Sequence, residues 1–96
     1  MLPTSSYLNQ NQNPPPAFGV VVYVRRDAEG RVHGRAANLV DVSASASTER
    51  ELFMKILPLC KASIRNSLEA GNSEPLLPSL LSPHADEKKT FFPLHL

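Results

Sequence analysis

The 96-residue chain contains one cysteine and no tryptophan, and neither sign of charge is in clear excess. A single cysteine excludes a disulfide within the chain. Lysine plus arginine number 10 against 9 acidic residues, so only a local patch would attract a nucleic acid or an anionic membrane. No apolar run approaches the roughly 20 residues that a membrane-spanning helix needs, and the first residues lack the pattern of a secretory signal. We therefore expect a cytoplasmic protein.

Composition divides the chain into a tail and one small domain. Residues 1–17 consist largely of Asn, Gln, Ser and Pro, and they contain too few apolar side chains to offset the entropy of ordering them. We expect this tail to be disordered and residues 18–96 to form a single α+β domain. Within that domain, the prolines at positions 75, 78 and 83 predict an irregular Pro-rich loop over residues 72–89.

A β-hairpin is the clearest pattern in the sequence. The segment Phe18–Arg26, FGVVVYVRR, is aromatic and β-branched and predicts a strand. Its side chains are apolar on both faces, which is typical of a strand inside a sheet. Asp27–Gly30 predicts a turn with Gly30 in the left-handed conformation, after which Arg31–Ala36 returns as the antiparallel partner.

A short third strand and a long helix follow. Ser43–Ser47 alternates small polar and small apolar residues, which predicts a strand, and Thr48 with Glu51 has the spacing of a capping box. Gly71 is placed to end the helix. The residues expected on the buried stripe are Phe53, Ile56, Leu57, Cys60, Ile64 and Leu68, widened by Leu52 and Leu59. The stripe keeps its phase through Pro58, which predicts one kinked helix.

These elements predict an α+β fold in the order β-β-β-α-β. It is a three- to four-stranded antiparallel sheet with one long, Pro-kinked helix packed on one face. The last strand, Thr90–Leu96, contains Pro93, which confines it to an edge of the sheet or breaks it. One helix covers only one face, so we expect the other face to be uncovered and available for a partner or a second copy.

Basic residues gather on the predicted hairpin. If the two strands pair, a cationic row forms on the face away from the helix, with an aromatic ring near enough to stack on a base. The residues of this possible nucleic-acid or partner face are Tyr23, Arg25, Arg31, His33 and Arg35. The alternative is a solvated face whose arginine stems cover apolar surface.

Catalytic and metal-binding patterns are sparse. No two of His33, His84, His95 and Cys60 have the close spacing of a zinc site, and Cys60 fits a small core residue better than a nucleophile. No phosphate-binding, dinucleotide-binding or hydrolase motif occurs. Asp27 and Glu29 are explained by the turn. We expect no enzyme activity, no cofactor and no small-molecule substrate.

The order of these segments resembles the core of the HicB-like antitoxin family. The resemblance rests on the segments Phe18–Val24, Asp27–Gly34, Ser47–Glu51 and Leu68–Gly71, with Pro75 downstream, and covers a little over half the chain. It implies a partial ribonuclease H-like β-β-β-α-β fold and an antitoxin-like, non-catalytic role in protein binding. The family's Pro-Asp-rich motif after the second strand is replaced here by Ala36–Asp41.

Two functional hypotheses follow from the sequence. The first is a non-enzymatic interaction module that binds a protein partner or itself through its uncovered sheet face or an edge strand. The second is an RNA-binding module that uses the cationic sheet face.

Overall fold

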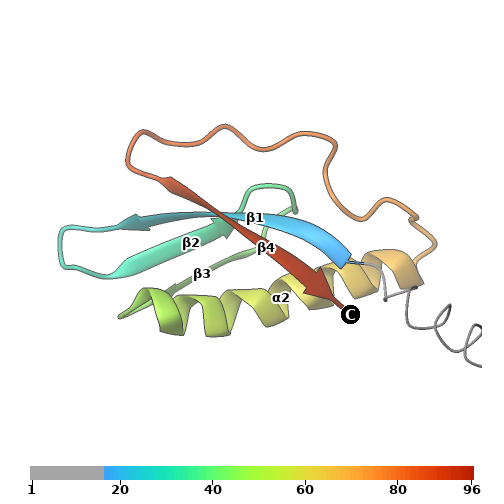
Figure 1. Cartoon of the computed structure of the whole chain (residues 1–96), viewed down its shortest axis with the longest axis horizontal. Coiled ribbons are helices and arrows are strands. Elements are labelled where there is room, and N and C mark those ends of the chain that lie inside the picture. Colours follow the sequence, from blue (N-terminus) through green and yellow to red (C-terminus); the bar gives the residue numbers. More distant parts are fainter. Residues whose placement is uncertain (1–16) are drawn as a thin grey trace, which may run out of the picture.

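The computed structural model describes residues 17–96 as a four-stranded antiparallel sheet with one helix on one of its faces (Figure 1). The elements are β1 (Ala17–Arg26), β2 (Val32–Ala36), β3 (Ser43–Ala46), α2 (Glu49–Glu69) and β4 (Lys88–His95). The strands lie in the order β3-β2-β1-β4. The predicted α+β class and the order β-β-β-α-β are confirmed. Of the tail predicted to be disordered, residues 1–16 lie outside the described residues, whereas Ala17 already begins β1.

The hairpin between β1 and β2 has the predicted turn. Gly30 has a φ of 84°, and its N–H donates to the carbonyl oxygen of Asp27 over 3.0 Å. The Asp27 carboxylate accepts the backbone N–H groups of Glu29 and Arg31, each at 2.9 Å. A side chain that fixes its own turn in this way is a local device, which explains why the sequence alone predicts it.

Pairing along β1 continues beyond the end of β2 through a side chain. The Asn38 amide accepts the N–H of Val21 over 3.1 Å and donates to the carbonyl oxygen of Gly19 over 2.9 Å. Ala37 donates its N–H to the carbonyl oxygen of Val21. Asn38 is buried, so its amide replaces the backbone partner that β1 would otherwise lack.

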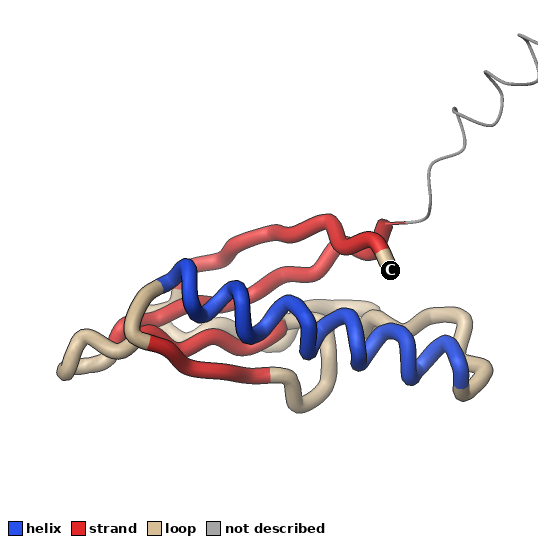
Figure 2. The backbone as a smooth tube through the Cα atoms, turned by 90° about the horizontal axis from the view of Figure 1, so that it is seen from below, coloured by secondary structure: helices blue, strands red, loops and turns tan. Residues whose placement is uncertain are grey.

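The helix packs on the face formed by alternate residues of β1 and β2. Helix α2 lies against β2 and β3, and Figure 2 shows it crossing the strands at an angle. An added Cβ at Gly34 would lie 2.8 Å from Cδ2 of Leu52, so the glycine lets the helix approach the sheet. The side chains of this core are Val20, Val22, Val24, Val32, Ala36, Leu39, Val42, Ala46, Leu52, Ile56, Cys60, Ile64 and Leu94.

Both ends of α2 follow the sequence. Thr48 is the N-cap, and its hydroxyl accepts the N–H of Glu51 over 3.1 Å. The Glu51 carboxylate lies 3.3 Å from that hydroxyl. At the other end Gly71 has a φ of 94°, its N–H donates to Leu68 and that of Asn72 donates to Ser67. These two bonds form a Schellman motif, which satisfies carbonyl groups of the last turn.

The buried stripe of α2 differs in phase from the prediction. Its fully buried residues are Leu52, Ile56, Cys60 and Ile64, whereas Phe53 and Leu57 are only half-buried. Leu59, expected to widen the stripe, is exposed. The phase is set by Leu52, which fills the space above Gly34. The helix continues through Pro58, whose ring lies on the exposed side.

The face of the sheet opposite α2 is covered over β1 and β2, contrary to the prediction, whereas Phe91 on β4 remains 63% exposed. Residues 72–87, the crossing segment, pass over this face (Figure 1, orange). The N–H of Leu77 donates to the backbone carbonyl oxygen of Asn38 over 2.9 Å, and the N–H of Leu81 donates to that of Ala37 over 2.7 Å. The Tyr23 hydroxyl donates to the carbonyl oxygen of Leu81 over 2.8 Å. The Pro-rich segment is irregular, as predicted, but it is hydrogen-bonded to the sheet.

Strand β4 is an edge strand, as Pro93 predicted. The backbone groups of Gly19 and Val21 point toward the β2 side of β1, so those of Val20 and Val22 point toward β4. In the register of β1 and β4, Pro93 lies opposite Gly19, and its nitrogen therefore faces the open edge. The missing N–H removes no hydrogen bond from the sheet.

Candidate interaction surfaces

The predicted cationic residues of β1 and β2 do share the face opposite α2. Arg25 lies opposite His33, and Tyr23 lies opposite Arg35, in the register of the hairpin. Arg25, His33 and Arg35 border a polar hollow of about 390 Å³ beside the crossing segment. The hollow is lined by Arg25, His33, Gly34, Arg35, Ser43, Ala44, Ser45, His84 and Glu87.

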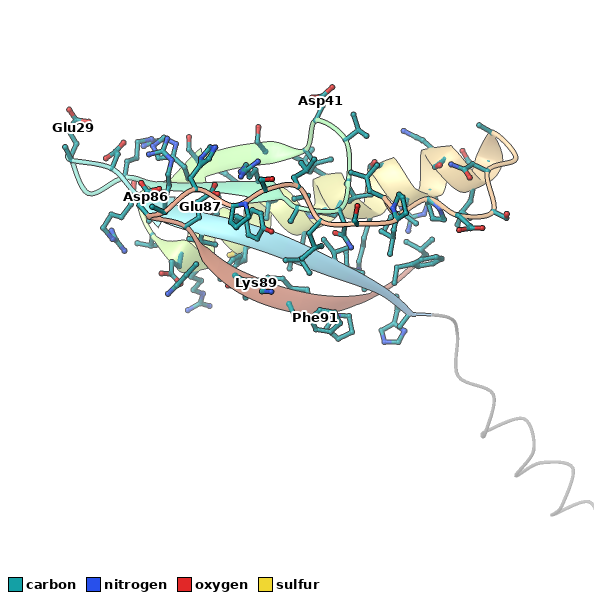
Figure 3. The ribbon with its side chains drawn as sticks, turned by 90° about the horizontal axis from the view of Figure 1, so that it is seen from above. Glu29, Asp41, Asp86, Glu87, Lys89 and Phe91 are labelled. Atoms are coloured by element: carbon teal, nitrogen blue, oxygen red, sulfur yellow. The ribbon has the colours of Figure 1, made fainter. Side chains whose placement is uncertain are left out.

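Arg35 is held by an acidic residue that sequence reasoning missed. Its guanidinium donates to both carboxylate oxygens of Glu87, at 2.7 and 2.8 Å, and to the carbonyl oxygen of Ser82 at 2.7 Å. The Glu87 side chain is 3% exposed. The hydrogen bonds from Arg35 outweigh the effect of burial and lower the pKa of Glu87 from 4.5 to about 2. The pair therefore stays ionised at neutral pH and holds the end of the crossing segment to β2. Figure 3 shows Glu87 at that end, where the segment meets β4.

His33 also has an acidic partner. Its Nε2 lies 2.8 Å from Oδ2 of Asp27, and hydrogen bonding to His33 and to the backbone of Arg31 lowers the pKa of the Asp27 carboxyl. Arg31 is exposed, and its guanidinium reaches only the Ser45 hydroxyl, at 3.5 Å. Two of the cationic side chains are thus committed to carboxylates within the domain.

Tyr23 is not available to stack on a base, which corrects the sequence prediction. The residue is 3% exposed, and the guanidinium carbon of Arg35 lies 5.1 Å from the centre of its ring. This cation–π contact and the bond to Leu81 occupy both the ring and the hydroxyl. Within residues 17–96, Arg25 and Arg31 remain as the members of the predicted face that form no ion pair.

Cys60 lies in the core and not in a cleft. Its side chain is fully buried, and burial raises the pKa of the thiol to about 11, so it is protonated at neutral pH. Among the described residues, no three His, Cys, Asp or Glu side chains are close enough to hold a metal ion. His33, His84 and His95 are not brought together with Cys60.

An apolar surface on α2 is the feature that sequence reasoning did not identify. We call it the α2 docking face; its residues are Phe53, Met54, Leu57 and Pro58. Together with Arg50 and Lys61 they line an open hollow of about 820 Å³. Met54 is 69% exposed, and it adjoins the partly buried Phe53 and Leu57 on this surface. The half-buried Phe53 ring packs edge-on against Phe92, with centroids 4.8 Å apart, and so joins this face to β4.

The docking face has a positive charge at each end. Arg50 lies one turn before Met54, and Lys61 lies one turn after Leu57. Neither residue forms an ion pair with another residue in the part of the chain described, 17–96. Of the two acids in the first turn of α2, Glu49 is paired with Lys88 at 3.1 Å, and the exposed Glu51 lies 3.3 Å from the Thr48 hydroxyl. A signal for this face exists in the sequence, because Phe53, Met54, Leu57 and Pro58 follow helical spacing beside the buried stripe.

Comparison with known protein families, curated proteins and solved structures found no match for this chain. The element order is the one that the HicB-like resemblance implies, and membership of that family stays a prediction. In residues 17–96 no helix combines the length and the apolar character needed to span a bilayer.

Proposed function

We propose that this chain is a non-enzymatic protein-interaction module that binds a partner on the α2 docking face. The observation that supports the proposal is an exposed methionine between a half-buried phenylalanine and a half-buried leucine on one side of a rigid helix. Methionine and aromatic residues are enriched at the centres of protein interfaces, where burial from water supplies most of the affinity.

The arrangement of the helix explains why this surface is apolar. Helix α2 packs against β2 and β3, whereas Phe18 and Phe92, on β1 and β4, remain half-buried beside it. On the side of α2 toward β4, apolar side chains therefore continue from the core to the surface, and no helix or strand covers them there. A partner seated there would complete the burial of Phe53, Leu57 and Phe92.

The chemistry of the remaining groups fits a binding role. The one thiol is buried and protonated, and the carboxylates of Asp27 and Glu87 are ionised by hydrogen bonds to neighbouring side chains. General acid–base catalysis at neutral pH favours groups with pKa values near 7. The pKa of Cys60 is raised and those of Asp27 and Glu87 are lowered, so all three move away from 7. An antitoxin-like role, which the HicB-like resemblance implies, belongs to the same class of protein-binding function.

Fewer residues support the RNA-binding alternative than the sequence predicted. Arg25 borders the polar hollow, and Arg31 is exposed just before β2, so both can meet phosphate groups. Tyr23 is buried, and the side chains of His33 and Arg35 are bound by Asp27 and Glu87. Two cations without an aromatic platform favour weak, sequence-independent phosphate contact over base recognition.

A selection experiment tests the proposed function without a known partner. An unbiased library of displayed peptides is enriched on the full-length chain and then measured on Met54→Glu and on the control Asn66→Glu. Met54 and Asn66 are both exposed on α2, so neither substitution should alter the fold. We expect binders that lose at least tenfold in affinity on Met54→Glu and are unchanged on the control. A selection whose binders do not distinguish Met54→Glu from the natural chain would refute the proposal.

A further inference from the structure

We propose that the α2 docking face accepts an amphipathic helix of a different protein, apolar in its middle and acidic at both ends. This inference rests on the proposed function and specifies the class of partner. It follows from the apolar centre of the face and from Arg50 and Lys61 at its two ends. A helix laid into an apolar groove is a common mode of peptide recognition, read through anchors at helical spacing.

The charges define the spacing of the partner's acids. Arg50 and Lys61 are eleven residues apart on a continuous helix, which places their backbone positions about 16 Å apart. Arg65, exposed one turn beyond Lys61, extends the positive end. A partner helix with acidic residues about three turns apart, and an apolar stripe between them, can meet both ends at once. Charge pairs at the rim of such an interface select partners and speed association.

A second copy of this chain is a poorer occupant because its charges repel. If two α2 helices packed antiparallel about the centre of the docking face, Arg50 of one copy would lie opposite Lys61 of the other. If they packed parallel, each cation would meet its own counterpart. Residues 1–16 of this chain contain no acidic residue, so they do not match the charges either.

The open edge of β4 is a less suitable binding site for a partner than the docking face. Pro93 offers no N–H at the open edge, and Lys88 and Lys89 place positive charge at the start of the strand. Proline and lysine are the residues that protect exposed strand edges from pairing with another chain. Lys89 and Phe91 lie on β4, the strand at the edge of the sheet (Figure 3).

The test uses a second displayed library, of helical peptides with a fixed apolar stripe and randomised residues at two flanking positions eleven apart. It is enriched on three full-length chains: the natural chain, Arg50→Glu with Lys61→Glu, and Lys55→Glu with Lys89→Glu. The last variant makes the same change in net charge at exposed lysines outside the docking face. We expect at least threefold enrichment of Asp and Glu at both flanks on the natural chain and the control. On the first variant the preference should reverse to Lys and Arg.

Each other outcome overturns the inference. If the peptides selected on all three chains carry the same flanking charges, the inference is overturned. The proposed function stays in place in that case, provided that binding still depends on Met54. A dimer of the natural chain in light scattering that Met54→Glu converts to a monomer would also overturn the inference. If no peptide of either library binds the natural chain more tightly than Met54→Glu, the inference and the proposed function both fail.

Discussion

Arg35 on β2 and Glu87, the residue before β4, form a bidentate ion pair with distances of 2.7 and 2.8 Å. The pair closes the crossing segment over the face of the sheet opposite α2. It also removes Arg35 from the cationic row that the hairpin would otherwise present. A contact between residues 52 positions apart thus helps to hold the crossing segment against this face.

Replacing Glu87 should loosen the crossing segment. In Glu87→Gln, Arg35 loses its charge-assisted partner in a site where the carboxylate is 3% exposed, so we expect a loss of about 1.5–3 kcal/mol in the free energy of unfolding. Chemical denaturation measures this loss, and hydrogen exchange at Leu77 and Leu81 should speed up. The exposed neighbour gives the control, because Asp86→Asn should change stability by less than about 0.5 kcal/mol. Equal stability of the two variants would contradict the importance of the pair.

The same pair predicts a dependence of stability on pH. The folded-state pKa of Glu87 lies at about 2, below its ordinary value of 4.5, so the unfolded chain binds the proton more tightly than the folded one. The contribution of Glu87 is therefore complete above about pH 4.5 and is lost as the pH falls from there through about 2. Between pH 6 and pH 2, the free energy of unfolding measured by chemical denaturation should fall more steeply for the natural chain than for Glu87→Gln. The shallower slope contributed by Asp27 should remain in both, and identical slopes would contradict the assignment to Glu87.

Gly34 is the position at which a methyl group should be most harmful. An added Cβ lies 2.8 Å from the fully buried Leu52 side chain, which has no room to move, so Gly34→Ala should cost about 1–3 kcal/mol. Gly19→Ala gives the comparison, because its added Cβ meets the ring of Phe91, which is 63% exposed and can turn away. We expect that variant to change stability by less than about 0.5 kcal/mol. Thermal unfolding of both variants checks the order, which would be reversed if α2 packed elsewhere.

RNA binding by the cationic face should be weak. With Tyr23 buried and two cations matched by carboxylates, we expect a Kd no tighter than about 10⁻⁴ M for a short single-stranded RNA at physiological salt. Fluorescence anisotropy measures this affinity for the natural chain and for Arg25→Ala with Arg31→Ala. Micromolar, salt-sensitive binding that the double variant abolishes would establish RNA binding as a function of this face.

Much of the fold was predictable because its signals are local. The turn at Asp27–Gly30, the cap at Thr48 and the end of the helix at Gly71 each depend on residues within five positions of one another. The order of the elements and the edge position of β4 follow from hydrophobic pattern and from Pro93. In each case the residues that determine the structure lie within the segment that forms it.

The surfaces were harder to predict because they depend on long-range contacts. Nothing near Arg35 in the sequence indicates Glu87, and nothing near Tyr23 indicates Leu81. The irregular crossing segment was therefore expected to leave the sheet face open, and the structure places it across that face. The phase of α2 depends on Leu52 meeting Gly34, and this contact turns Phe53, Met54 and Leu57 toward the surface. The candidate docking face follows from a rotation of the helix that periodicity alone does not determine.

We propose that the α2 docking face is the binding surface of this domain. The most direct measurement compares the affinity of selected peptides for the natural chain, for Met54→Glu and for Asn66→Glu. The account predicts at least a tenfold loss on Met54→Glu, about 1.4 kcal/mol, and no change on Asn66→Glu. Equal affinity for all three chains would contradict it and would place the binding surface elsewhere.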